Sequence, residues 1–349
     1  MRAFPHRPAG LLAAAASLAL LAGCQRQAPA VDASAGASTP SPAGAVERAP
    51  PAVPAYVPNQ KSGSISVIDT GTDKVVRTLS AGGELGKRLQ QIALGPEGKT
   101  LYVVDAEHHR LLLVDIAGDK VERELDIGEG AEGVGLSPDG KQVAVCVEQQ
   151  NQVMFVDTAS FTVKGHVDVQ GKAPEHCAWT PDGTQVITSN EASDSLDVID
   201  VAAGKSVASI ATSGHPRDIA FASDGHTAYV AQESADVVDV IDLVARRKTR
   251  SVTAGLRTAG VTVSPDGSRV YASNGGGASV TVSDGATGKL LAEIPVGQRP
   301  WNPSLTPDGR KLYVANGRSN SVSVIDTASM KEIGQIAVGE MPWGVVMGR

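Results

Sequence analysis

The stretch Pro300–Pro342 reads PWNPSLTPDGRKLYVANGRSNSVSVIDTASMKEIGQIAVGEMP and contains the pattern of four short strands. An apolar run precedes a Pro-Asp-Gly turn, and the alternating segments LYVAN and SVSVIDT and a last segment ending in Val338-Gly339 follow it. Alternation of apolar and polar residues is typical of strands with one buried face, and Pro-Asp-Gly is typical of a hairpin turn. We therefore predict that this stretch forms one small antiparallel sheet.

The same unit recurs along the chain at a nearly constant period. Successive turns begin 42 or 43 residues apart, at Pro96, Pro138, Pro181, Ser223, Pro265 and Pro307. An aspartate follows the third strand seven times, at Asp69, Asp115, Asp157, Asp200, Asp242, Asp284 and Asp326. Four-stranded units of this length, repeated around an axis, form a β-propeller. We predict an all-β fold, a seven-bladed β-propeller with four antiparallel strands per blade.

One repeat is divided between the two ends of the chain, because seven third strands accompany only six turns. The chain enters the repeats at Tyr56 with a second strand and closes at Pro342-Trp343-Gly344-Val345-Val346 with a first strand. We therefore predict that N-terminal strands and a C-terminal inner strand complete the last blade. Hydrogen bonds between the two ends would leave no unpaired edge at the seam.

The seven recurring aspartates resemble a carboxylate ring, but each stands where the third strand turns into the fourth. A short acceptor at such a position bonds the backbone two residues on, so we interpret these aspartates as structural. The outer strands carry charge, which is typical of solvated sheet edges.

Residues 1–23 have the pattern of a lipoprotein signal peptide. A basic start precedes an apolar run from Leu11 to Ala22, and the segment Leu21-Ala22-Gly23-Cys24 ends it. This segment resembles the lipobox of bacterial lipoproteins, which implies lipidation of Cys24 and attachment to a membrane through that lipid. Because Gln25 is not aspartate, the sorting rule of that family favours the periplasmic side of the outer membrane over the inner membrane.

Residues 24–54 are rich in Ala, Pro, Ser and Gly. Such a segment cannot bury enough apolar surface to offset chain entropy, so we expect a disordered tether. The repeats consume residues 55–349 and leave no second domain, and we expect a monomer. The net charge of −7 argues against nucleic acid as a partner, because that needs clustered Lys and Arg.

Beyond Cys24 the chain contains two cysteines, Cys146 and Cys177. They fall on the second strand of one blade and the first strand of the next. Spacing alone does not set their Cβ geometry, so we interpret them as small buried apolar residues, with a disulfide in an oxidising compartment as the alternative. No Cys-x-x-Cys-His motif is present, which excludes covalent c-type haem, and we predict no cofactor.

Residues that differ between the repeats are the candidates for function. The loop entering the first strand and the loop between the second and third strands emerge on the same side, around one mouth of the central channel. Loops freed from the demands of the fold are where binding residues gather. The predicted ligand- or partner-binding residues are Gln90, Glu132, Glu175, His176, Arg217, Asp218, Arg299, Trp301, Asn302 and Trp343.

Further polar groups surround this mouth. Lys87, Arg88 and Arg257 lie just outside the entry loops, and the second set of loops adds Asp105-Ala106-Glu107-His108-His109, Glu148-Gln149, Asn190-Glu191, Gln232-Glu233, Asn274 and Asn316. Mixed aromatic and charged groups suit a small ligand or a partner protein, although they also suit a solvated funnel.

His176 with Glu175, and with His215 of the next blade as a further candidate, could ligate a metal or an axial cofactor position. No His-x-His or His-x-x-x-His pair exists, so we predict no metal site. We also predict no catalytic residue, since no Gly-x-Ser-x-Gly elbow is present. The contrasting hypothesis is a hydrolase in which Glu132, Glu175, His176 and Asp218 act as acid, base or ligand groups.

The motifs YVPN at Tyr56–Asn59, YVAN at Tyr313–Asn316 and SVIDT at Ser66–Thr70 and Ser323–Thr327 resemble the YVTN-family β-propeller repeat. The resemblance covers residues 56–349 and implies a secreted or surface propeller. The last fifty residues also resemble a YVTN subgroup associated with PQQ-dependent alcohol catabolism. Relatives in this broad family include redox-enzyme subunits, d1-haem-type propellers and lactonase-like proteins.

The chain departs from true quinoproteins, which resemble eight-bladed propellers with a tryptophan at the end of each outer strand. Its own tryptophans, Trp179, Trp301 and Trp343, all lie at inner strands. We therefore expect a non-catalytic periplasmic lipoprotein, a binding scaffold or accessory protein for a quinoprotein or redox system. The alternatives are a lactonase-like hydrolase and a redox propeller that holds haem or a quinone at its mouth.

Overall fold

The computed structural model describes residues 52–348, which form strands and two short 3-10 helices, η1 (Glu148–Gln150) and η2 (Glu191–Ser193). The first strands are β1 (Pro54–Asn59), β2 (Ser64–Asp69), β3 (Lys74–Leu79), β4 (Leu89–Leu94), β5 (Thr100–Asp105), β6 (Arg110–Asp115), β7 (Lys120–Asp126), β8 (Ala131–Leu136), β9 (Gln142–Val147), β10 (Gln152–Asp157), β11 (Thr162–Asp168), β12 (Pro174–Trp179), β13 (Gln185–Asn190) and β14 (Ser195–Asp200). The remaining strands are β15 (Lys205–Ala211), β16 (Pro216–Phe221), β17 (Thr227–Gln232), β18 (Val237–Asp242), β19 (Arg247–Thr253), β20 (Thr258–Val263), β21 (Arg269–Asn274), β22 (Ser279–Asp284), β23 (Leu290–Pro295), β24 (Pro300–Leu305), β25 (Lys311–Asn316), β26 (Ser321–Asp326), β27 (Lys331–Ala337) and β28 (Val346–Met347).

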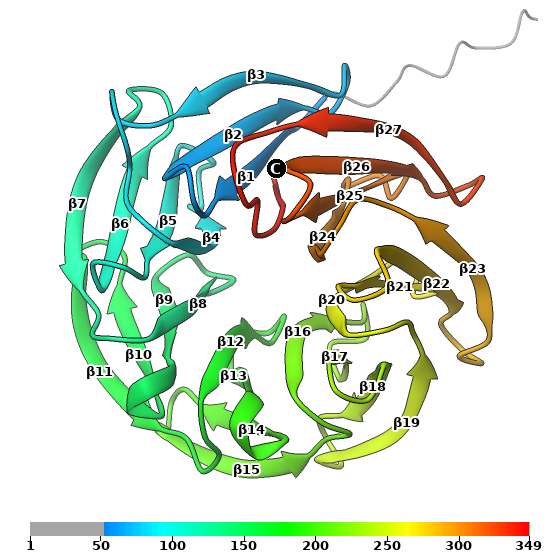
Figure 1. Cartoon of the computed structure of the whole chain (residues 1–349). Helices are drawn as coiled ribbons and strands as arrows, with labels where there is room; N and C mark the ends of the chain where they lie inside the picture. The colour runs from blue at the N-terminus through cyan, green and yellow to red at the C-terminus, as the bar shows by residue number, and fades with distance from the viewer. Residues whose placement is uncertain (1–51, 349) are drawn as a thin grey trace, which may run out of the picture. The chain divides into compact units, whose positions relative to one another are not determined.

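These strands form seven four-stranded antiparallel sheets set as blades around one axis (Figure 1). Blades 2 to 7 are the consecutive quartets β4–β7, β8–β11, β12–β15, β16–β19, β20–β23 and β24–β27. In each quartet the first strand lies at the axis and the fourth at the rim (Figure 1). The prediction of a seven-bladed all-β propeller is confirmed.

Blade 1 joins the two ends of the described chain. Its strand order is β28-β1-β2-β3, so the last strand of the chain is the innermost strand of the first blade. Ala55 pairs with Met347 and Tyr56 with Val346, and the backbone N–H of Trp343 donates to Pro58 O at 3.0 Å. The predicted closure by N-terminal strands and a C-terminal inner strand is therefore confirmed.

The hydrophobic core lies in layers between neighbouring blades. Alternating residues of β5, such as Tyr102 and Val104, pack against Val143 and Val145 of β9. The layer at the seam has the same form, with Tyr313 of β25 packed among residues of β1. Each strand thus buries one face against the next blade, as the alternation predicts.

The repeated polar residues brace turns and loops. All seven recurring aspartates accept a backbone N–H two or three residues on, which confirms their structural interpretation. Asn316 is fully buried and donates to Ser321 Oγ and Ser323 Oγ. Asn190 and Asn274 are buried in the same way, so these three asparagines brace the loops from inside and do not face the mouth as the sequence suggested.

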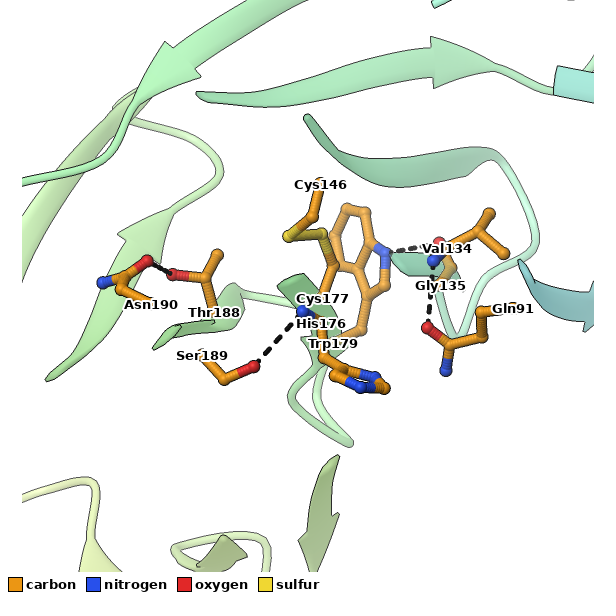
Figure 2. The surroundings of a disulfide bond; sticks show 10 residues. All are labelled: Gln91, Val134, Gly135, Cys146, His176, Cys177, Trp179, Thr188, Ser189 and Asn190. Atoms are coloured by element: carbon orange, nitrogen blue, oxygen red, sulfur yellow. Dashed lines mark hydrogen bonds between the residues drawn. A yellow bond between two sulfur atoms is a disulfide. The ribbon is translucent and has the colours of Figure 1, made fainter. Parts of the chain in front are cut away.

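Cys146 and Cys177 form a disulfide, and their Cα atoms lie 5.7 Å apart (Figure 2). Both are buried, as expected, but their interpretation as unbonded apolar residues was wrong. β12 packs against β9 across the boundary between blades 3 and 4, which brings the two cysteines together within one core layer. The inter-blade packing that decides this geometry is not visible in sequence spacing.

The predicted signal peptide, the lipidation site at Cys24 and nearly all of the predicted tether lie outside the described residues. Among residues 52–348 no helix is long and apolar enough to cross a membrane.

Candidate functional site at the channel mouth

Three recurring positions in the blades supply the side chains around one mouth of the channel. The first position directly precedes the inner strand and has φ between 50° and 81° in all seven blades, at Arg88, Gly130, Ala173, His215, Arg257, Arg299 and Met341. Residues other than glycine rarely adopt this conformation. Because every blade repeats it, we attribute it to the fold, and its effect here is to bring four basic side chains to the mouth.

The second position is the second residue of the inner strand and its counterpart Trp343 in blade 1. It holds Gln90, Glu132, Glu175, Arg217, Ala259, Trp301 and Trp343. The third position follows the second strand of each blade and holds Gln60, Ala106, Glu148, Glu191, Glu233, Gly275 and Gly317.

A cavity of about 220 Å³ opens among these positions. Its lining comprises Gln60, Arg88, Gln90, Glu132, Glu148, Glu175, Glu191, Arg217, Trp301 and Trp343. Six of the ten predicted mouth residues are therefore in its wall, and Arg88, Glu148 and Glu191 come from the flanking loops that the sequence also indicated. Gln60 was missed, although it follows the YVPN motif at the position that Glu191 occupies in blade 4.

Arg217 is the central cation of the cavity, and its side chain is 10% exposed. Its guanidinium lies 2.7 Å from Glu175 Oε1, 3.3 Å from Glu191 Oε2 and 3.5 Å from Glu233 Oε2. It therefore ties blades 4 and 5 together, while its Nε has no hydrogen-bond partner among the described residues.

A second group of charges lies beside the cavity and centres on the carboxylate of Glu233. Glu233 accepts from Arg257 Nε at 2.8 Å and from Arg299 Nη1 at 3.2 Å. Burial opposes ionisation of Glu233, but Arg217, Arg299 and Arg257 outweigh burial and hold the pKa of this carboxyl below its usual value.

The carboxyl groups in the wall differ in how easily they ionise. Burial raises the pKa of Glu175 well above its usual value, against the attraction of Arg217. Burial likewise raises the pKa of Glu132, and burial together with Glu191 and Glu132 raises the pKa of Glu148 to about 7. The hydrogen bond from His215 instead holds the pKa of Glu191 at about 2.

A line of amides connects three blades along the opposite wall. Gln60 Nε2 donates to Gln90 Oε1 at 3.0 Å, and Gln90 Nε2 donates to Glu132 Oε1 at 2.8 Å. Arg88 lies 3.6 Å from the same carboxylate. Glu132 is thus held in place from blades 1 and 2.

Aromatic rings from blades 4, 7 and 1 stack in a row at the mouth. The His176 ring lies 5.4 Å from Trp343, and Trp343 lies 6.1 Å from Trp301 at an interplanar angle of 14°. The guanidinium of Arg299 covers Trp301 at 4.3 Å from the ring centroid, and that of Arg217 lies at 5.2 Å. Such distances are within the range of cation–π attraction.

Four predicted site residues do not line the cavity. His176 is buried behind Trp343, and burial lowers its pKa to about 3. Asp218 Oδ2 accepts the Val261 N–H at 3.0 Å and so joins β16 to β20. Arg299 covers Trp301, and Asn302 is buried where the chain pairs with Gly344.

A metal site is not indicated by the geometry. Within residues 52–348 no group of three His, Cys, Asp or Glu side chains has an arrangement that could hold a metal ion.

Comparisons with known proteins agree on the architecture. Residues 201–336 match the family model "Lactonase, 7-bladed beta-propeller". No curated protein matches the chain significantly. Among solved structures, hydrazine synthase from Kuenenia stuttgartiensis is similar, with a TM-score of 0.71, 24% identity, and coverage of 78% of this chain and 92% of that chain. A functionally unknown protein from Desulfotomaculum acetoxidans has a TM-score of 0.73 at 16% identity, covering 85% of this chain and 99% of that one.

These two structural matches have low sequence identity and establish a shared fold. The part of the chain that matches the family model spans most of blades 5 to 7.

Proposed function

We propose that the protein is a non-catalytic binding propeller, anchored through Cys24 on the periplasmic side of the outer membrane, whose channel mouth binds a small ligand or a partner protein. The observation that carries this proposal is the cavity of about 220 Å³ in which carboxylates and stacked indoles converge. Aromatic walls with a few convergent polar groups are typical of binding pockets. The likeness of the last fifty residues to a PQQ-associated subgroup supports an accessory role beside a periplasmic quinoprotein.

Lactone hydrolysis is the second candidate, and the family match over residues 201–336 favours it. In that function Glu132 or Glu175 would take a proton from a water molecule that attacks the lactone carbonyl. Two other groups of the hydrolase hypothesis have different tasks, since His176 stacks behind Trp343 and Asp218 bonds the backbone of the next blade. This is why binding is preferred to catalysis.

Both functions can be tested on the full chain. We expect a panel of small molecules, grouped by charge, to contain ligands that change the emission of Trp301 and Trp343 saturably, and a Trp301→Leu variant to lose that response. A lactone panel followed by proton release should show no turnover above the uncatalysed rate. Lactone turnover that disappears in Glu132→Gln would replace binding by hydrolysis as the function, and a panel without any ligand would overturn the binding proposal.

A further inference from the structure

The mouth has two chemically distinct halves. Blades 3 and 4 supply carboxylates, and blades 7 and 1 supply Trp301 and Trp343. A Cβ atom at position 317 would lie 2.6 Å from Trp301 Nε1, so the glycine at this position leaves space for the indole. The aromatic half therefore depends on a small residue at the same position where the acidic half carries Glu148 and Glu191.

Acidic groups outnumber basic groups in the cavity wall. Four carboxyl groups face two guanidinium groups, those of Arg88 and Arg217. His215 at 3.1 Å from Glu191 adds a cation beside the wall. Arg257 and Arg299 lie beyond this wall and share the single carboxylate of Glu233. Within the wall itself, a cationic ligand would pair with carboxyl groups that exceed Arg88 and Arg217 in number.

One carboxylate has unused capacity. Glu175 is 2% exposed, and its Oε2 has no hydrogen-bond partner among the described residues, whereas its Oε1 binds Arg217. A buried acceptor of this kind costs free energy unless a donor reaches it. Glu175 lines the cavity, so a ligand with N–H or polarised C–H groups would be able to supply that donor.

The aromatic half already holds cations of this chain. The guanidinium of Arg299 lies 4.3 Å from the centroid of Trp301, which demonstrates that the indole accepts a flat cation at contact distance. Tryptophan is the best aromatic side chain for cation–π binding, and aromatic rings are the usual surroundings of quaternary ammonium ligands.

We infer that the mouth recognises an organic cation, a monovalent ammonium or guanidinium head group held between the carboxylates and Trp301, an inference that rests on the proposed binding function. The cavity of about 220 Å³ is smaller than the roughly 300–1,000 Å³ typical of pockets for drug-sized ligands, so it suits a head group alone. Burial raises the pKa values of Glu132, Glu148 and Glu175, and a cation bound beside these carboxyl groups would lower them again.

Calorimetric titration of the full chain at pH 8 tests the inference. The first pair of probes is choline and 3,3-dimethylbutan-1-ol, which share a shape and differ in charge, and we expect choline to bind at least tenfold more tightly. Acetyl-arginine methylamide and acetyl-lysine methylamide represent side chains of a partner protein. Tighter binding of these amides than of choline assigns the cation to a protein, and the reverse assigns it to a free metabolite.

Variants separate the wall groups from general charge. Glu148 lies in η1 with its side chain partly exposed, so Glu148→Gln should fold normally and weaken binding of the best cation about tenfold. Trp301→Leu should weaken it by a similar factor through loss of cation–π attraction. Glu122→Gln, the same charge change on the exposed outer strand β7, is the matched control and should leave affinity unchanged.

Two results would overturn the inference. One is equal or tighter binding of the neutral alcohol or of succinate, which would leave the binding function intact with a different ligand class. The other is cation binding that survives both Glu148→Gln and Trp301→Leu. If neither these probes nor the wider panel binds, the proposed function itself fails.

Discussion

Single side chains at the mouth owe their surroundings to neighbouring blades rather than to their own. His176 is held by the Trp343 ring of blade 1, and Asp218 by the Val261 N–H of blade 6. Both residues belong to the set that the sequence suggested for binding. The prediction was based on their residue types, but contacts with residues more than forty positions away determine their structural roles.

His176→Phe should change how stability depends on pH. The imidazole has a pKa of about 3 in the folded protein, whereas the usual value is 6.5. Burial is the main cause of this lowering, Arg217 adds to it, and Glu191 opposes it. Glu175 also lies beside the ring. The folded protein therefore binds fewer protons than the unfolded chain below pH 6.5, and the free energy of unfolding falls as pH drops. Phenylalanine keeps the stack on Trp343 without titrating.

Urea unfolding between pH 6.5 and 4 measures this effect. We expect the free energy of unfolding of the variant, relative to that of the wild type, to rise by up to about 1.4 kcal/mol for each pH unit of acidification. Parallel curves for the two proteins would contradict the buried neutral imidazole.

Asp218→Ala should weaken the contact between blades 5 and 6. It removes the acceptor of the Val261 N–H, and an unpaired buried donor costs about 1–3 kcal/mol. Asp218→Asn keeps one acceptor oxygen and avoids burying a charge. Burial raises the pKa of Asp218 to about 7, so the wild type loses stability as pH rises toward and through 7. The stability of the asparagine variant relative to the wild type should therefore increase from pH 5 to pH 8.

Chemical unfolding of both Asp218 variants at pH 5 and pH 8 is the measurement. An alanine variant as stable as the asparagine variant at both pH values would mean that the bond to β20 contributes nothing.

At the scale of strands and loops, each inner strand lies against the inner strands of its neighbours. Gly133 on β8 shows how close this approach is, because a Cβ there would lie 2.4 Å from Glu175 O of β12. The disulfide joins the same two blades through β9 and β12 (Figure 2). Blades 3 and 4, which carry the acidic half of the mouth, are therefore joined by a disulfide as well as by close packing.

Replacing both Cys146 and Cys177 by alanine should lower the free energy of unfolding by roughly 2–4 kcal/mol. The disulfide closes a loop between cysteines 31 residues apart, and its loss increases the conformational entropy of the unfolded chain. Urea unfolding with and without reductant gives the value, and a cross-linked peptide in a non-reducing digest verifies the bond. A wild type that shows both thiols free after purification from an oxidising compartment would refute the link.

Gly317→Ala should alter the mouth with little effect on stability. The new Cβ would lie 2.6 Å from Trp301 Nε1, so the indole has to move away from its stack on Trp343. Gly334→Ala on β27 is the control, because no atom lies within 4 Å of its Cβ. We expect a changed tryptophan emission spectrum and a melting temperature within a few degrees of the wild type for Gly317→Ala, and neither change for the control. An unchanged spectrum would mean that Trp301 is not packed against this glycine.

For the whole molecule, the ring is only as stable as its seam. Besides the β28 pairing, Lys311 Nζ reaches Asp73 at 2.7 Å and Tyr313 donates its hydroxyl to the same carboxylate, so β25 of blade 7 is also bound to the β2–β3 turn of blade 1. Trp343 belongs to both the seam and the binding wall. Closure and the mouth are therefore built from the same segment.

Deleting residues 342–349 should lower the melting temperature by about 10 °C or more. The deletion exposes the inner edge of β1, removes Trp343 from the mouth and leaves Tyr56 and Ala55 without partners on that edge. Deletion of the equally long segment 25–32, which precedes the propeller, is the control for chain length and should not change the melting temperature. A truncated protein that melts within a few degrees of the intact one would contradict closure through β28.

The sequence alone determined the seven blades, the strand order within them, the divided first blade and the structural role of the recurring aspartates. These features follow from alternation and turn chemistry, which act over a few residues and are repeated seven times, so each copy supports the others. Tertiary structure decided the Cys146–Cys177 bond, the inward asparagines, the bridging role of Asp218 and the union of Gln60, Glu148 and Glu191 with Trp301 in one cavity. These contacts join different blades, and their geometry depends on how closely the inner strands approach one another. It also depends on the residue with positive φ before each inner strand. No local sequence pattern predicts positive φ for residues as large as Arg88 and Arg299.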